Sequence, residues 1–177
     1  MKKTFILTIV LAFFTLIGVA SAQTGSGTLS ITANIQGSIN LTFVTDASGM
    51  AVTGSTTSTA SLALGNVSMF GGTVPANVTK TVNSTTSFDL STPFDVRVDL
   101  ANSASTTYTL AAMLSAAEAA GKVWTLGPTD ISAGASHAMT STGAYATAVP
   151  YTLKLTIPAS AAAGSISNTI NFTATAN

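Results

Sequence analysis

The stretch VPYTLKLTIPASAAAGSISNTINFTATA, residues 149–176, decides the fold class of this chain. Apolar and polar residues alternate in two runs, one from Tyr151 to Ile157 and one from Ile166 to Ala176. Successive side chains of a β-strand point to opposite faces, so each run has one apolar and one polar face. Pro158 and Gly164 lie between the runs and favour a chain reversal. The stretch therefore predicts a long antiparallel β-hairpin whose apolar face needs a second layer.

The middle of the chain shows the same alternation between turn residues. It is clearest from Phe94 to Leu100, where Asp95, Arg97 and Asp99 occupy the polar positions. Weaker patterns predict short strands at residues 60–64, 67–70, 78–82, 88–90, 108–114 and 123–126, whereas residues 129–143 are predicted to be mostly loop. About eight to ten short strands with regular turns predict an all-β antiparallel sandwich, with a closed barrel as the alternative.

The first 22 residues have the pattern of a secretory signal peptide. Lys2 and Lys3 precede an apolar run from Phe5 to Val19, and Ala20-Ser-Ala22 follows as a cleavage site of small residues. The run is shorter than the roughly 20 residues that a membrane-spanning helix needs. We therefore predict cleavage after Ala22 and a single domain over residues 23–177, large enough to bury a core of its own.

Composition excludes several classes of function. Only 7% of the residues are charged, the formal net charge is +0, and no basic stripe marks a surface for nucleic acid or anionic membrane. Serine and threonine take over the solvation of the surface, which favours strands. The chain has no cysteine, which rules out disulfides, thiol chemistry and cysteine metal sites.

The first alternating segment of the mature chain is unusually long. Leu29, Ile31, Ala33 and Ile35 share one parity, and the pattern continues beyond Gly37 to Phe43. One straight strand over these residues would exceed the roughly 40 Å diameter of a domain of this length. Either the strand bends at Gly37 and stays in its own domain, which is the interpretation we favour, or its first half leaves the domain.

Candidate catalytic and metal-binding residues are few. His137 is the only histidine and lies in a predicted polar loop, with Asp130 the nearest acid for a serine triad, but no serine stands in a Gly-x-Ser-x-Gly turn. Asp95 and Asp99 flank Arg97 as a solvated charge ladder. The loop that begins at Asp46 lacks the ligand spacing of a calcium site. We predict no catalytic residue, no metal site and no cofactor.

Three aromatic residues could form a platform for a sugar. They are Trp124, Tyr145 and Tyr151. Trp124 stands between Val123 and Leu126 in a predicted strand, which favours a place in the core. A buried Trp124 would count against carbohydrate binding.

The two ends of the mature chain resemble those of spore coat U-like proteins and chaperone–usher fimbrial subunits. The resemblance rests on residues 149–160, on Gly164 at the fourteenth position from the end, and on the terminal alternating strand. Two features depart from the family: Ala176 stands where the family has an aromatic residue, and the cysteine pair of most such pilins is absent. The resemblance implies an immunoglobulin-like β-sandwich. In this family a subunit borrows a missing strand from a neighbour's N-terminal extension, and Leu29, Ile31, Ala33 and Ile35 are similar to such a strand-exchange segment.

These observations predict an exported structural subunit of a bacterial surface fibre or coat. The expected partners are further copies or related surface subunits, and a periplasmic chaperone during transit. No nucleic acid or, after cleavage of the signal peptide, membrane partner is expected. A secreted adhesion or carbohydrate-binding module is the alternative.

Overall fold

The computed structural model of the protein describes residues 28–118 and 121–177. The chain divides into two units, Met1–Asn34 and Ile35–Asn177, and the architecture below is that of the second unit. Its described residues form strands and loops but no helix, and the strand pairs are all antiparallel. The prediction of an all-β antiparallel fold is confirmed. The predicted signal peptide, residues 1–22, lies outside the described residues.

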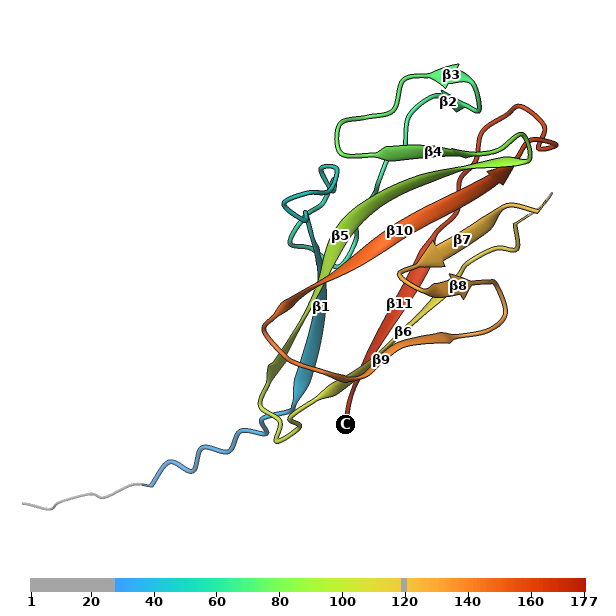
Figure 1. Ribbon diagram of the computed structural model, residues 1–177. Coiled ribbons are helices and arrows are strands. Elements are labelled where there is room, and N and C mark those ends of the chain that lie inside the picture. Colours follow the sequence, from blue (N-terminus) through green and yellow to red (C-terminus); the bar gives the residue numbers. More distant parts are fainter. Residues whose placement is uncertain (1–27, 119–120) are drawn as a thin grey trace, which may run out of the picture. The chain divides into compact units, whose positions relative to one another are not determined.

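The larger sheet has six strands in the order β1-β5-β10-β7-β8, and β4 also pairs with β5 (Figure 1). Its strands are β1 (Ser38–Val44), β4 (Thr79–Asn83), β5 (Ser87–Ala101), β7 (Val123–Leu126), β8 (Thr129–Ile131) and β10 (Ala148–Pro158). The smaller sheet has the order β11-β6-β9. Its strands are β6 (Tyr108–Leu114), β9 (His137–Gly143) and β11 (Ile170–Ala176). A separate two-stranded hairpin is formed by β2 (Val67–Ser68) and β3 (Gly71–Gly72).

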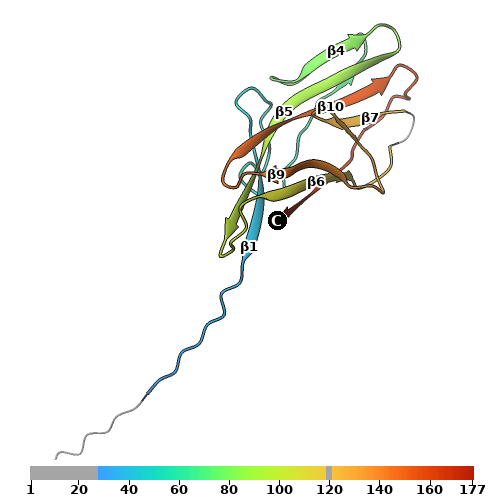
Figure 2. The same ribbon diagram turned by 60° about the horizontal axis from the view of Figure 1, so that its bottom comes forward.

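The two sheets form a sandwich-like arrangement around one core. Figure 2 shows them as two layers, with β5, β10 and β7 in one and β6 and β9 in the other. The predicted parity of the strands is confirmed, because Phe94, Val96 and Val98 point inward while Arg97 is exposed. Further buried core residues are Phe88, Leu90, Tyr108, Leu110, Ala112, Leu114, Trp124, Leu126, Ile131, Leu153, Leu155 and Ile157. Tyr108, at 0% exposure, is the largest of the fully buried side chains.

The prediction that residues 149–176 form one hairpin is wrong. β10 pairs with β5 and β7 in the larger sheet, whereas β11 pairs with β6 in the smaller one. The second run is also shorter than predicted, since β11 begins at Ile170 and not at Ile166. The connecting residues 159–169 are enough to carry the chain from one sheet to the other. Alternation shows that one face of a strand is buried, but it does not say which strand lies beside it.

The central strand β5 runs through Pro93 and joins two segments, residues 88–90 and 94–100, that the sequence predicted as separate strands. β4 pairs with residues up to Ser91 on one edge of β5, and β1 pairs from Asp95 onward on the same edge. The Pro93 carbonyl faces this junction, where a Cβ on Gly49 would overlap its oxygen. Because the carbonyl and amide of a strand residue point the same way, the amide that proline lacks falls where no ladder partner exists.

Thr92 forms buried hydrogen bonds at the place where β4 ends and β1 begins along β5. Its side chain is buried, accepts a hydrogen bond from the Met50 amide at 2.9 Å and donates to the Asn77 carbonyl at 3.0 Å. Asn77 in turn donates through its side-chain amide to the Gly49 carbonyl. The long connection between β1 and β4 is thereby fastened to the centre of the larger sheet.

Residues 129–143 contain two strands where mostly loop was predicted. β8 extends the larger sheet and β9 forms an edge of the smaller one. The β9 segment has little apolar alternation, and its register with β6 is irregular between Tyr108 and Ala111. Because its pairing depends on the neighbouring strand β6, its own sequence pattern did not predict a strand. For residues 60–64 the error is the reverse: a strand was predicted, but the structure has only an isolated bridge between Ser61 and Thr53.

Candidate functional site

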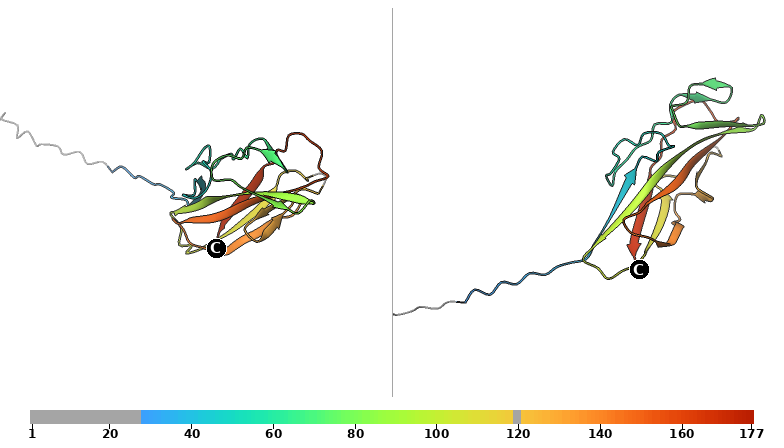
Figure 3. Two further views of the ribbon diagram at one scale, coloured as in Figure 1. Left: turned by 45° about the horizontal axis from the view of Figure 1, so that its top comes forward. Right: turned by 60° about the vertical axis from the view of Figure 1, so that its left-hand side comes forward.

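One edge of the smaller sheet is open. β11 pairs with β6 over its whole length, and no other strand of the described chain pairs with its second edge. β1 lies close to that edge and runs in the opposite direction (Figure 3). Its backbone is hydrogen-bonded to β5 and, at Phe43, to Thr56 and Thr57, but in the described chain it forms no ladder with β11. The sandwich is therefore not closed between β1 and β11, and a row of β11 backbone groups has no ladder partner.

Three phenylalanine rings lie between β1 and β11. The Phe172 ring of β11 contacts Phe43 of β1 edge to face, with centroids 5.2 Å apart, and Phe94 of β5 at 6.1 Å. Phe94 is buried at 4% exposure, whereas Phe43 and Phe172 are only half-buried. The alternation predicted an apolar face for the run from Ile166 to Ala176, and Phe172 lies on that face. It is only half-buried because no strand of the described chain covers the free edge of β11.

Half-buried apolar side chains continue along both sides of the opening. On β1 they are Leu41 and Phe43, and on β11 they are Ile170, Phe172 and Ala174. Together with buried Phe94 they form an apolar strip between β1 and β11, which we call the apolar groove. A half-buried row of this kind next to an unpaired strand edge is the arrangement that an added strand would complete.

A cavity lies at the end of the domain where β11 begins. It has a volume of about 980 Å³ and lies over the larger sheet, with Phe88, Leu90, Leu155 and Ile157 among its lining residues. Residues 62–69 and 161–168 also line this cavity. The larger sheet extends beyond the smaller one here, because β6 ends at Leu114, and loops cover the remaining inner surface.

A polar network holds the loop that precedes β11. Asn168 donates from its side-chain amide to the Ala116 carbonyl and to Glu118 Oε1, both at 2.9 Å. The Trp124 indole N–H donates to the same Glu118 oxygen at 2.9 Å. Burial acts to raise the pKa of Glu118, but the hydrogen bonds from Asn168 and Trp124 and the charge of Lys122 outweigh it, so the pKa lies below its usual value. The ionised carboxylate thus ties the start of β11 to β7.

His137 contacts Ser132 in the turn that precedes β9. It opens β9 and is half-buried, not exposed in a loop as predicted, and its Nε2 lies 3.0 Å from Ser132 Oγ and 3.3 Å from the Ser132 amide. Asp130 accepts a hydrogen bond from Thr125 and none, among the described contacts, from His137. The imidazole thus binds the turn between β8 and β9, and no hydrogen bond within the described residues joins it to a carboxylate.

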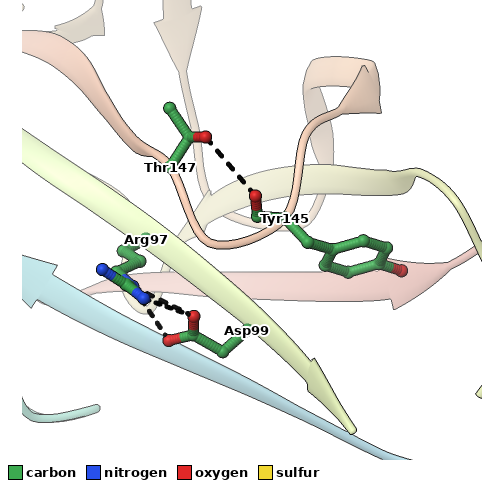
Figure 4. A network of polar contacts seen from close by, with 4 residues as sticks. All are labelled: Arg97, Asp99, Tyr145 and Thr147. Carbon is green, nitrogen blue, oxygen red and sulfur yellow. Dashed lines mark hydrogen bonds and ion pairs between the residues drawn. The ribbon is translucent and has the colours of Figure 1, made fainter.

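Asp95 and Asp99 of β5 belong to two separate pairs of charged residues. Arg97 binds Asp99 through two nitrogens at 2.9–3.1 Å on the exposed face of the sheet, as Figure 4 shows beside the Tyr145–Thr147 turn. Asp95 faces Asp46, and burial together with the Asp46 charge raises the pKa of Asp95. In the described part of the chain no three acidic, histidine or cysteine residues are grouped as metal ligands would be.

The three aromatic residues considered for sugar binding do not form a platform. Trp124 is buried at 8% exposure, as its sequence context predicted. The Tyr145 hydroxyl donates to the Thr107 carbonyl at 2.8 Å and fastens the loop that follows β5. Tyr151 is half-buried against the core.

The predicted strand-exchange residues are not part of the sandwich core. Leu29 is 84% exposed, Ile31 82% and Ile35 75%, and no described residue before Ser38 belongs to a strand. The favoured interpretation, a strand that bends at Gly37 and continues into its own domain, is therefore wrong for residues 29–37. The structure leaves an alternating apolar segment without a partner strand.

Sequence reasoning missed most of the groove. Leu41 and Phe43 were recognised only as the continuation of an alternating run, and their position opposite β11 had no local signal. Glu118 and Asn168 were not singled out at all, since a hydrogen bond between residues 50 positions apart leaves no pattern in the sequence.

Comparison with protein-family models, with curated proteins and with solved structures finds no match for this chain. Among the described residues there is no helix that is long and apolar enough to cross a membrane. The groove is consequently interpreted from its own geometry.

Proposed function

We propose that this chain is an exported structural subunit of a bacterial cell-surface fibre or coat, and that subunits join by β-strand addition. The observation that carries the proposal is the coexistence of an open apolar groove and an unpaired apolar segment in one chain. The immunoglobulin-like sandwich of one copy would be completed by residues 29–35 of another. The low charge and the signal-peptide pattern support export to the cell surface.

The segment and the groove agree in length and parity. β11 has 7 residues, and the span from Leu29 to Ile35 covers the same number of positions. Both would extend about 23 Å at 3.3 Å per residue. Every second residue of the segment is apolar, so its apolar side chains would all face Phe43, Phe94 and Phe172, while Ser30, Thr32 and Asn34 would face solvent.

The expected gain in free energy is large enough for a stable joint. Burying a leucine or isoleucine side chain contributes about 1.5–3 kcal/mol. Leu29, Ile31 and Ile35 are each at least 75% exposed, so most of this burial free energy would be gained when a second copy covers them. The added strand would also satisfy the unpaired backbone groups of β11, which would otherwise promote unspecific association.

An open groove implies a partner before assembly. A half-buried apolar surface next to a free strand edge is prone to aggregation during export. We therefore include a periplasmic chaperone that covers the groove among the proposed partners. The alternative of a secreted adhesion or carbohydrate-binding module required exposed aromatic residues, and no observation favours it because Trp124 is buried.

A peptide spanning residues 27–36 tests the proposal on the full-length mature protein. Added in excess, the peptide should occupy the groove, cap each copy and stop the growth of oligomers that the protein forms alone. The readouts are sedimentation velocity and binding of a fluorescently labelled peptide. A control peptide with Ile31→Asn should neither bind nor cap. A mature protein that stays monomeric at high concentration and does not bind the peptide would rule out strand addition.

A further inference from the structure

The tip of the β2–β3 hairpin presents an exposed aromatic ring. Phe70 is 82% exposed and lies between Ser68 and Gly71, the inner ends of the two short strands. Single exposed apolar residues are common on protein surfaces. Phe70 differs from them in its support and in its position, and both point to an interaction surface.

The hairpin below Phe70 is anchored. Lys80 of β4 donates from Nζ to the Gly71 carbonyl at 2.8 Å and to the Ser68 carbonyl at 3.1 Å. Gly72 has a φ of 80°, and a Cβ there would lie 2.8 Å from the Asn66 carbonyl oxygen. The lysine ammonium thus binds the base of a two-residue turn, which holds the phenyl ring away from the core.

The hairpin also borders the cavity near the start of β11. Val67, Ser68 and Met69 line this cavity, as do the residues just before β11. Met69 packs against the core, whereas Phe70, the next residue, is exposed to solvent. If the strand of a second copy fills the groove, either that strand or the folded domain that follows it, which we call the partner's body, would lie close to Phe70.

The direction of the added strand decides which end of the groove the partner's body occupies. β1 begins and β11 ends at the same end of the domain, beside the loop from Ala101 to Tyr108 that joins β5 to β6 (Figure 1). A strand added parallel to β11 would bring the partner's body to that end, where the recipient's own chain leaves at Ser38. An antiparallel strand brings the body to the opposite end, beside Phe70, and permits head-to-tail growth.

The connection between strand and body is short. Only Gln36 and Gly37 separate Ile35 from Ser38, so the added strand ends within about 11 Å of its own domain, at up to 3.6 Å per residue. A Cβ on Gly37 would lie 3.0 Å from the Asn102 carbonyl oxygen and 3.4 Å from the Ser103 Cβ. The exposed loop at Asn102 and Ser103 is therefore the part of the incoming body next to its strand.

We propose that Phe70 of one copy packs against the 102–105 loop of the copy whose strand fills its groove. This inference rests on the proposed function and adds a body-to-body contact to the strand joint. The contact would fix the angle between successive subunits, because the two-residue connection alone leaves that angle free. It also explains why an aromatic ring of a single copy is exposed on a hairpin that borders the cavity near the start of β11.

Introduced cysteines test the contact directly, since the chain has none of its own. A Phe70→Cys protein and a Ser103→Cys protein, mixed and assembled, should form a disulfide between copies on mild oxidation. A mixture of Thr81→Cys and Ser103→Cys is the control, because Thr81 is exposed on the neighbouring strand β4. The thiol of the Phe70→Cys protein should also react with maleimide at least tenfold more slowly in the assembled state than in peptide-capped monomers.

The outcomes separate the two proposals. Normal assembly with no 70–103 disulfide, or with the thiol of the Phe70→Cys protein equally reactive in both states, would overturn the body contact and leave strand addition standing. Absence of assembly and of peptide binding in the unsubstituted protein would remove the proposed function itself. As a second variant, Phe70→Ser should bind the peptide within twofold of the unsubstituted protein but raise the concentration needed for assembly at least fivefold. A loss of peptide binding would instead place Phe70 in the fold of the groove and overturn the contact.

Discussion

The rings of Phe43 and Phe172 meet edge to face at 5.2 Å although their strands, β1 and β11, share no hydrogen-bond ladder. An edge-to-face pair contributes about 0.5–1.5 kcal/mol beyond the area it buries. This contact joins the two sheets at a place where the backbone does not. Together with Phe94, the two rings form the apolar surface between β1 and β11.

Truncation of the groove floor should show how far Phe172 contributes to stability. Phe172→Ala should lower the free energy of unfolding by about 2–3 kcal/mol, less than the about 3–5 kcal/mol expected for Phe94→Ala, because Phe172 is only half-buried. Thr173→Ala, on the exposed face of the same strand, should cost under about 0.5 kcal/mol. Urea unfolding of peptide-free protein measures all three, and equal costs at positions 172 and 173 would show that the strand faces the other way.

Substitution within residues 29–35 should affect assembly without affecting the domain. Ile31→Asn should raise the concentration needed for assembly more than tenfold, because it places an amide among the phenylalanine rings. The matched control is Thr32→Asn, whose side chain would face solvent. Both variants should unfold at the same urea concentration as the unsubstituted protein, since residue 31 is 82% exposed and in no strand. Equal assembly by the two variants would contradict the proposed parity.

The Glu118 network should make stability depend on pH. The pKa of Glu118 is lowered in the folded protein, so its stabilising effect is complete above the ordinary value of 4.5 and is lost as the pH falls through the folded pKa. Glu118→Gln should therefore cost about 1–2 kcal/mol at pH 7 and much less at pH 3. Urea unfolding at the two pH values gives the comparison, and a cost that does not change with pH would argue against an ionised carboxylate at this position.

Processing of the N-terminus gives a direct mass prediction. Secreted protein should have the intact mass of a chain that begins at Gln23. This follows from the small residues Ala20 and Ala22 at the end of the apolar run. A secreted form that retains residues 5–19 would contradict the signal-peptide interpretation and, with it, the export on which the proposed function depends.

Local pattern was sufficient for the fold class and for the faces of the strands. The residues of β6 and β7 follow from alternation alone, as do the buried faces of β5 and β10, because the side-chain period of a strand is a property of its backbone. The candidate strand-exchange residues could likewise be named from their parity. That Leu29 and Ile31 would be exposed could not, because burial depends on what lies opposite.

Which strands lie side by side could be learned only from the tertiary structure. Nothing in residues 149–176 says that β10 and β11 join different sheets, because each apolar face needs a cover and either sheet can provide one. Pro93 is tolerated in β5 because two other strands end and begin beside it. The groove is likewise the place where one more strand would be needed, and its position depends on contacts between residues as distant in sequence as Phe43 and Phe172.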